Sequence, residues 1–230
     1  MDIQKDYETW VQKIRQRLIK AFGKPEWRPT LPPVDELVST ILSQNTNDVN
    51  RDAAFQELRE TFPNWQAVME APTEEVVEAI RTAGLANQKG PRIQKALKQI
   101  AEYNEGEISL DFLKDMELEE ARKWLMGRKG VGPKTAAIVL LFSLGIPAFP
   151  VDTHIYRVTG RIGIRPEGLS VEKAHTYLEG NIPEEAFYDL HLNLIRLGRR
   201  VCGARKWHCY RCPVDDLCAF DEKNLDPDEV

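Results

Sequence analysis

The sequence predicts an all-α protein. Apolar residues recur at intervals of three and four over most of the 230 residues, which is the period of a helix with one buried face. Segments rich in Pro and Gly divide this pattern into stretches of helix length, and no stretch alternates polar and apolar residues convincingly enough to form a strand. No repeat at a fixed period occurs, so we expect the helices to pack as a globule, in one or two lobes, and not as a solenoid.

The first helices are predicted by three apolar stripes, which are Val11, Ile14, Leu18 and Phe22; Leu37, Ile41 and Leu42; and Ala54, Leu58 and Phe62. The stretches "FGKPEWRPTLPP" and "FPNW" end the first and third of these helices. Further breaks are expected at "NQKGPR", "GRKGVGP", "GIPAFP" and "GIRPEG", and they delimit the later helices.

Composition limits the classes of function. With 42% hydrophobic and 29% charged residues the chain can bury a proper core. The start, "MDIQKDYETW", has no apolar signal region, and no run is long enough to cross a bilayer, so we expect a cytoplasmic protein, associated with the nucleoid if the source is prokaryotic. The net charge of −5 argues weakly against a nucleic-acid partner, but it averages over faces that a polyanion would sense separately.

The charge is distributed unevenly near the C-terminus. No acidic residue occurs between Leu190 and Val214, whereas this stretch carries Arg196, Arg199, Arg200, Arg205, Lys206 and Arg211. Beyond Val214 acidic residues dominate, as expected of a solvated end. The basic stretch is either a solvated face or a surface for a polyanion.

A glycine-rich turn precedes a buried helix in "GVGPKTAAIVLLFSLG". Pro133 suits the first helical turn, and the following apolar run is expected to stop at Gly145. Gly130 and Gly132 would form a hairpin whose backbone N–H groups can approach a phosphate, assisted by the charges of Arg128 and Lys129. A plain connector between two helices is the alternative.

Two helix N-termini carry charged residues that could do chemistry. Lys134 lies in the first turn of the helix after the hairpin, where the helix dipole disfavours a protonated amine and so favours a nucleophile. Asp152 precedes "THIYRVTGRIG" and is expected to be an N-cap, where the helix end favours the ionised carboxylate. A phosphate-pairing lysine and a purely structural cap are the alternatives.

The four cysteines give a more specific signal. Cys202, Cys209, Cys212 and Cys218 follow the pattern C-x6-C-x2-C-x5-C, and four thiolates in seventeen residues can close around one metal centre. Zinc and a [4Fe–4S] cluster both accept four thiolates, and the spacing alone leaves both open. Disulfides are not expected in a chain without an export signal.

Taken in this order, "GVGPKTA", "VDTHIYRV" and the cysteine pattern resemble the endonuclease III family, which are base-excision DNA glycosylases with an attached lyase activity. The resemblance extends from about "LVSTILSQNTND" to Cys218. It implies that Lys134 is the nucleophile, that Asp152 is the essential carboxylate, and that the four cysteines hold a [4Fe–4S] cluster. The implied partner is double-stranded DNA with a damaged base or an abasic site, bound by a monomer.

The resemblance also implies DNA contacts. In "LSQNTND", Asn45 stands where the family has the glutamine that fills the gap left by the flipped base, but Gln44 is adjacent and a shift of one residue would exchange them. Leu85 resembles the family's apolar wedge. Further contacts are expected from Lys129, Gly130, Gly132, Arg199, Arg205 and Lys206.

The family pattern implies two helical lobes. Residues 26–146 would form a six-helix lobe with the hairpin motif at about 120–145, and residues 1–25 with 147–230 would form a lobe carrying the cluster loop 202–218. Lys134 and Asp152 would then face each other across a cleft. Before "GVG" the chain has Arg128 and Lys129 in place of the usual leucine and proline. Removal of oxidised pyrimidines is the expected activity; a G/T or G/U mismatch glycosylase, or a non-catalytic DNA-binding module, remains as an alternative.

Overall fold

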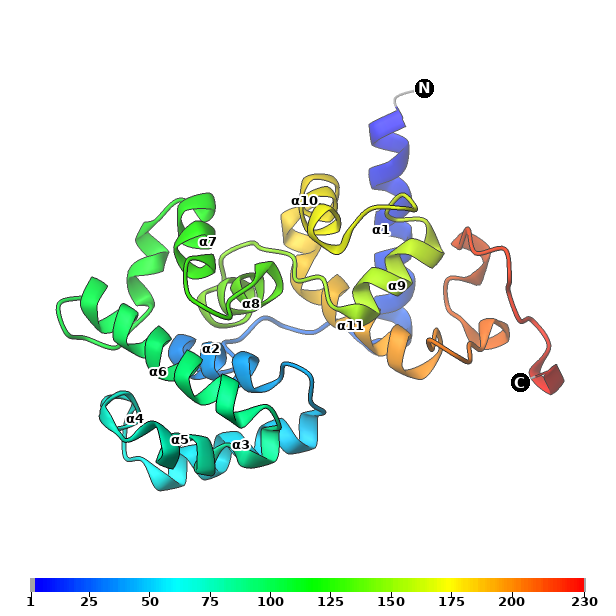
Figure 1. Cartoon of the computed structure of the whole chain (residues 1–230). Helices are drawn as coiled ribbons and strands as arrows, with labels where there is room; N and C mark the ends of the chain where they lie inside the picture. Colours follow the sequence, from blue (N-terminus) through cyan, green and yellow to red (C-terminus); the bar gives the residue numbers. More distant parts are fainter. Residues whose placement is uncertain (1–2, 230) are drawn as a thin grey trace. The chain divides into compact units, whose positions relative to one another are not determined.

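Helices make up the regular structure of the chain. The computed structural model describes residues 3–229, and within this range it contains α-helices, short 3₁₀ turns and one π-helical segment, but no strand (Figure 1). The all-α prediction is confirmed. None of the helices in the described range combines the length and apolar character needed to cross a membrane. The chain divides into two compact units, residues 29–146 and residues 1–28 with 147–230.

The unit of residues 29–146, here called the hairpin unit, contains seven α-helices: α2 (Pro33–Leu42), α3 (Asp48–Thr61), α4 (Trp65–Glu70), α5 (Thr73–Ala79), α6 (Ala86–Tyr103), α7 (Leu118–Met126) and α8 (Pro133–Ile138). Helix α6 packs against α4 and α5, while α2 packs against α3 and α8 (Figure 1). The predicted stripe residues Leu37, Ile41 and Leu58 are completely buried in this core. Apolar spacing therefore located the buried faces of α2 and α3 correctly.

The helix after the hairpin changes its winding. Helix α8 continues into a π-helical segment, Val139–Leu144, and ends at Gly145, which has a left-handed conformation with φ of 70°. The buried helix and its glycine stop are as predicted, but the second half is wound more widely than an α-helix. The amide of Ile146 donates to the carbonyl of Leu140 at 2.9 Å, which closes the end of the segment.

The predicted break at "NQKGPR" is wrong, because α6 runs through this stretch with Pro91 inside it. The chain turns earlier, at Gly84 and Leu85, which both have positive φ. A proline in the second helical turn removes one backbone hydrogen bond, and the buried stripe that continues along α6 outweighs that loss. Gly90 is explained by packing, since a Cβ there would lie 2.8 Å from Cγ2 of Val77.

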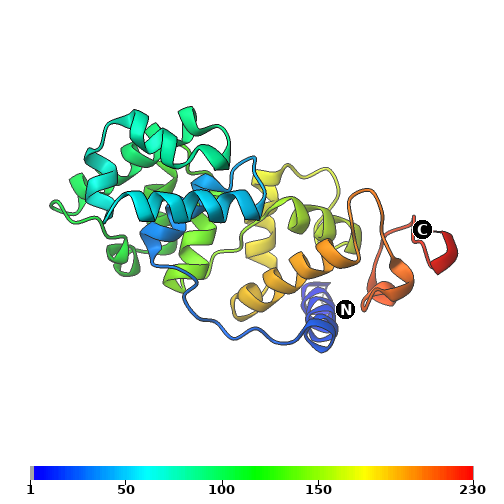
Figure 2. The same cartoon turned by 90° about the horizontal axis from the view of Figure 1, so that it is seen from below.

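The other unit, residues 1–28 and 147–230, is here called the cysteine unit. Its helices are α1 (Ile3–Phe22), α9 (Thr153–Ile162), α10 (Val171–Asn181) and α11 (Phe187–Arg200). Helix α11 packs against both α1 and α9, and the loop that carries the cysteines follows it (Figure 2). Gly198 permits the close crossing with α9, since a Cβ there would lie 3.1 Å from Cγ2 of Val158.

Polar contacts fix the N-terminal helix of the cysteine unit. Arg15 on α1 donates two hydrogen bonds to Asp189 on α11, at 2.8 and 2.6 Å, and this bonding raises the pKa of Arg15 above its usual value. The C-terminal end of α1 is capped by α11, because Asn193 donates to the carbonyl of Gly23 and Arg196 donates to that of Phe22, each at 3.0 Å. Arg196 therefore has a structural role within the basic stretch.

Candidate active site

The predicted hairpin connects α7 to α8. Gly130 has a φ of 90°, and a Cβ there would lie 3.0 Å from Cδ of Arg92, so both the backbone and the space favour glycine. Gly132 is extended, and a Cβ there would meet nothing within 4 Å. Only Gly130 is therefore required by the turn itself, whereas the backbone around Gly132 is open to an incoming group.

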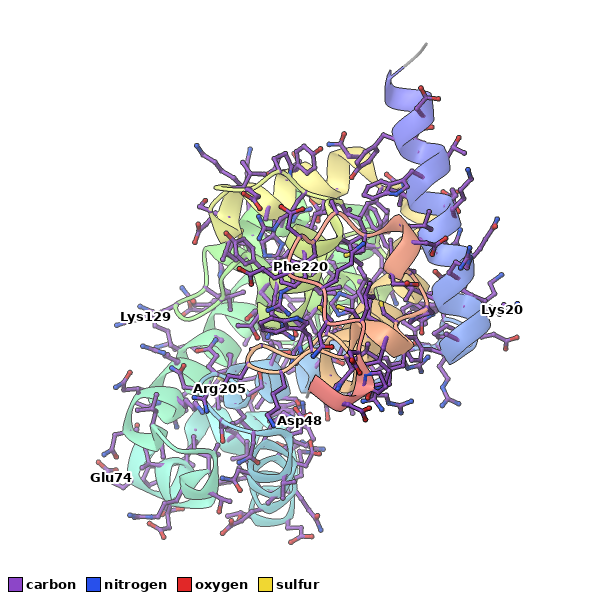
Figure 3. All side chains as sticks on the ribbon, turned by 90° about the vertical axis from the view of Figure 1, so that its right-hand side faces the viewer. Lys20, Asp48, Glu74, Lys129, Arg205 and Phe220 are labelled. Carbon is purple, nitrogen blue, oxygen red and sulfur yellow. The ribbon has the colours of Figure 1, made fainter. Side chains whose placement is uncertain are left out.

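Lys134 is the second residue of α8, directly after Pro133 at the helix start, as predicted. Its side chain is exposed, and no side chain caps this helix. Lys129 at the hairpin is also exposed (Figure 3). The hairpin thus presents two lysines on either side of its glycines.

Arg128 does not extend freely from the hairpin. Its guanidinium lies 4.1 Å from the ring centre of Trp124, and burial lowers its pKa below the usual value. Its Nε is buried without a hydrogen-bond partner among the described residues. The full positive charge expected beside the turn is therefore supplied by Lys129 more directly than by Arg128.

The structure separates the roles open to Gln44 and Asn45, which follow α2. The side-chain amide of Gln44 donates to the carbonyl of Gly130 at 2.8 Å, so this residue joins the α2 loop to the hairpin. Asn45 is exposed and has a left-handed backbone with φ of 53°. Of the two, Asn45 is the side chain that is available to a ligand.

Leu85 lies in a similar position before α6. It has φ of 51° and ψ of 28°, and 47% of its surface is exposed. A left-handed conformation is uncommon for a bulky residue and costs free energy. Leu85 is therefore not a core residue.

Asp152 is the N-cap of α9, as predicted. Its Oδ1 accepts a hydrogen bond from the backbone N–H of Ile155 at 2.7 Å. Val151 before it and Ile155 after it are buried, which fixes the backbone on both sides. Oδ2 has no hydrogen-bond partner among the described residues, so one oxygen of the carboxylate remains available. Asp152 belongs to the cysteine unit and Lys134 to the hairpin unit.

The four cysteines line one cavity in the cysteine unit, together with apolar side chains of α9 and α11 such as Ile162 and Leu197. All four are free thiols. Burial raises the pKa of Cys212 to about 12 and also raises the pKa of Cys218. In the described part of the chain, no group of three or more Cys, His, Asp or Glu side chains is arranged to hold a single metal ion.

Sequence reasoning missed Arg161, which organises the cysteine loop. Its guanidinium lies 4.7 Å from the ring centre of Trp207 and 4.8 Å from that of Phe220, the latter labelled in Figure 3. Its Nη1 is 3.4 Å from Sγ of Cys202 and donates to the carbonyl of Gly203 at 2.7 Å. This arrangement places a positive charge beside a cavity lined by sulfur, which suits a group with thiolate ligands. Arg161 lies on α9, 41 residues before Cys202, so the sequence gave no local signal of this contact.

The basic stretch divides into structural and exposed residues. Arg211 donates to the carbonyl of Arg200 at 2.8 Å, which is a contact within the fold. Arg199, Arg205 and Lys206 have exposed side chains at the end of α11 and in the loop that follows, as have Arg200 and Arg211. Arg205 is labelled in Figure 3. These exposed basic residues form a surface that a polyanion could reach in this region.

The sequence and the fold of this chain are similar to those of known proteins. Residues 38–184 match the family model described as HhH-GPD superfamily base excision DNA repair protein. The chain belongs to the HhH-GPD superfamily. It is 36% identical to an endonuclease III of Escherichia coli over 83% of this chain and 85% of that protein, and 32% identical to an endonuclease III of Sulfolobus acidocaldarius over 82% of each. Within the superfamily the chain is thus a member of the endonuclease III family.

Another relative and two solved structures are also similar to this chain. A putative DNA glycosylase of Arabidopsis thaliana is 36% identical over 75% of this chain, which spans 59% of the plant protein. A solved structure of a non-covalent endonuclease III–DNA complex superimposes with a TM-score of 0.78 at 28% identity, covering 92% of this chain and 95% of that one. A trapped covalent endonuclease III–DNA intermediate gives a TM-score of 0.79, also at 28% identity. This HhH-GPD protein is a base excision repair DNA glycosylase with AP lyase activity, and its family binds DNA and a [4Fe–4S] cluster.

Proposed function

We propose that this HhH-GPD protein removes oxidised pyrimidine bases from duplex DNA and then cleaves the strand, with Lys134 as the nucleophile. The observation that carries the proposal is an exposed lysine in the first turn of α8, immediately after the hairpin. DNA bound over the hairpin would exclude water from this amine and bring a sugar carbon within its reach. A glycosylase without a lyase activity needs no amine at this position.

An amine nucleophile determines the sequence of steps in the proposed reaction. The lone pair of Nζ attacks C1′ of the damaged nucleoside, and the base leaves with the electron pair of the glycosidic bond and takes up a proton. Opening of the sugar ring then gives a Schiff base between C1′ and Lys134. Loss of a proton from C2′ expels the 3′ phosphate by β-elimination, because the imine stabilises the electrons released at C2′.

Asp152 is proposed to act on the same sugar through its available oxygen, Oδ2. An ionised carboxylate stabilises positive charge that develops at the sugar as the base departs, and it can accept the proton that Nζ loses. The cap hydrogen bond from Ile155 to Oδ1 holds the carboxylate in one orientation. Preorganisation of this kind removes part of the reorganisation cost from the chemical step.

Two exposed residues of the hairpin unit are proposed to enter the duplex. Asn45 would fill the gap left by the flipped nucleotide, because Gln44 is already bonded to the hairpin. Leu85 would wedge between neighbouring base pairs, and its exposed left-handed position suits an apolar side chain that packs only when DNA is bound. Base removal requires such extrusion because the reacting C1′ bond is inaccessible in the stack.

A panel of duplexes, each with one altered base, tests the substrate class. We expect the single-turnover excision rate on oxidised pyrimidines to exceed that on T or U opposite G by at least about tenfold. One well-placed polar contact to the base is enough to discriminate between two substrates by that factor. The second candidate is the mismatch glycosylase, which is kept because Arg128, stacked on Trp124, stands where the family has leucine and so departs from the pattern that accompanies the usual lesion preference. Faster removal of T or U opposite G would make it the correct assignment.

The cysteine cavity is proposed to hold a [4Fe–4S] cluster and not zinc. Both groups accept four thiolates, and the four cysteines line one cavity. The cluster is favoured because this chain belongs to the endonuclease III family, whose members bind a [4Fe–4S] cluster. We propose that the cluster stabilises the loop 202–218 of this protein and takes part in no catalytic step.

Purified protein is expected to be yellow-brown and to contain about four irons per chain. Because the four thiolates are the ligands, a Cys212→Ala variant should lose most of this iron and its visible absorption. Metal analysis after anaerobic purification provides the measurement. Stoichiometric zinc without iron would contradict the assignment.

The exposed residues Arg199, Arg205 and Lys206 are proposed to contact DNA phosphates, with Lys129 at the hairpin. Loss of a phosphate contact weakens binding to all sequences alike, and each contact removed lowers the slope of log affinity against log salt concentration by about one unit. Titrations of Arg205→Ala and Lys206→Ala at several salt concentrations measure this slope. The proposed form is a monomer, which in a prokaryotic source would act on DNA in the cytoplasm, and light scattering checks its mass.

A further inference from the structure

Lys89 is buried in the hairpin unit, although lysine is almost never fully buried without a partner. It lies on the same stripe of α6 as Ile93 and Leu97, and only 1% of its surface is exposed. Its Nζ donates to the carbonyls of Leu42 and Ala83, each at 2.8 Å. Burial lowers the pKa of Lys89 below its usual value, and no carboxylate contributes to its environment.

Both carbonyl partners lie at the ends of helical segments. Leu42 is the last residue of α2, and Ala83 is the last residue of the 3₁₀ turn Arg81–Ala83. The final carbonyls of a helix have no partner within it, and the negative end of its dipole favours a cation. One ammonium group therefore satisfies two helix ends that are more than forty residues apart in the sequence.

Each of these ends leads to a proposed DNA-inserting residue within three positions. Asn45 is three residues after Leu42, and Leu85 is two residues after Ala83. In the described part of the chain only three residues other than glycine have positive φ, namely Asn45, Leu85 and Glu105. Backbone strain of this kind persists only where the surrounding structure holds it. Lys89 is a contact that holds both loops at once.

We propose that Lys89 is a positioning residue that fixes the Asn45 loop and the Leu85 loop relative to each other, so that both side chains enter the duplex at one lesion. The hydrogen bond from Gln44 to Gly130 extends the connection to the hairpin that carries Lys134. Pairing two helix-end carbonyls contributes to stability, but it does not explain why both carbonyls belong to the loops that carry the proposed inserting residues. This proposal depends on the roles assigned above to Asn45 and Leu85.

The test compares Lys89→Met with Lys95→Met on two substrates. Lys95 is an exposed lysine on the same helix, so its replacement removes the same charge without touching the loops. One substrate is a duplex with an oxidised pyrimidine, which requires base extrusion. The other is a single-stranded oligonucleotide with an abasic site, which requires only the lyase chemistry of Lys134.

Lys89→Met is expected to lower the single-turnover rate on the duplex by between about tenfold and 100-fold, because a misplacement of about 1 Å can have an effect of that size. Incision of the single-stranded abasic site should stay within about twofold of wild type, since α8 is unchanged. Lys95→Met should match wild type on both substrates. Lys89→Gln keeps two N–H donors on a shorter side chain and should recover part of the duplex rate.

Leu85→Ala separates this proposal from the one on which it depends. If Leu85→Ala lowers the duplex rate while Lys89→Met and Lys89→Gln leave it unchanged, Lys89 is not a positioning residue. Equal losses on both substrates for both Lys89 variants would also overturn the proposal, because they indicate a general structural role. Unchanged duplex excision by Leu85→Ala would instead refute the wedge itself. If the proposal is correct, the double variant Lys89→Met/Leu85→Ala should lower the duplex excision rate by less than the product of the two single effects.

Discussion

Lys134→Gln is expected to abolish both incision of abasic DNA and formation of a covalent protein–DNA adduct in the presence of borohydride. Borohydride reduces the Schiff base to a stable amine, so the adduct reports directly on the bond between Nζ and C1′. Gln has no basic nitrogen and cannot form this bond. The measurement is the fraction of labelled duplex retained with the protein on a denaturing gel, compared with wild type at equal occupancy.

DNA affinity of Lys134→Gln should remain within a few-fold of wild type, because one positive charge contributes little beside the other basic residues. Lys129→Gln is the matched control, since it removes an exposed lysine of the same hairpin. It should weaken binding by a similar small factor while the adduct still forms. If Lys134→Gln traps DNA as efficiently as wild type, another amine is the nucleophile.

Asp152→Asn is expected to slow base removal by about 100-fold to 1000-fold, which is the usual effect of losing one preorganised electrostatic group at a transition state. Binding of damaged duplex should persist, because the amide keeps the size and the hydrogen-bonding oxygen of the carboxylate. The fold should persist as well, since Asn and Asp are comparable N-caps. Single-turnover excision at saturating protein measures the chemical step without product release.

Asp152→Ala separates the cap from the chemistry. It removes the acceptor for the amide of Ile155 and should lower the free energy of unfolding by about 1 kcal/mol in addition to the loss of activity. Chemical denaturation of both variants measures this difference. Should Asp152→Asn retain a wild-type rate, Asp152 is only the cap of α9 and the carboxylate has no part in base removal.

Several features of the site were predictable because their signals are local. The four cysteines lie within seventeen residues, and the structure places them around one cavity. The glycine hairpin, Pro133 at the start of α8 and Asp152 at the start of α9 each follow from the conformational preferences of a few consecutive residues. Such preferences act over about one helical turn, so the sequence displays them directly.

Other features depend on groups that are distant in the sequence. The break expected at Pro91 is absent because the left-handed turn at Leu85 starts α6 earlier and the buried stripe carries the helix past the proline. Gln44 and Asn45 are neighbours with similar side chains, and only the hydrogen bond to Gly130, 86 residues away, distinguishes them. In the sequence Lys89 looks like an ordinary exposed polar residue. Its position on the apolar stripe of α6 could nevertheless have identified it as buried.

The sequence by itself determined the all-α class and the buried faces of its first helices, and it singled out the residues proposed as nucleophile, carboxylate and thiolate ligands. These depend on side-chain type and on spacings of a few residues, which are properties of the chain before it folds. The tertiary structure alone decided which side chains of the basic stretch are exposed, that Asn45 and not Gln44 is available, and that one buried lysine joins two loops. The physical reason is that packing between elements sets burial and hydrogen-bond partners. For Lys89, moving the ammonium group from water into the core costs free energy, and the hydrogen bonds to the carbonyls of Leu42 and Ala83 offset part of that cost.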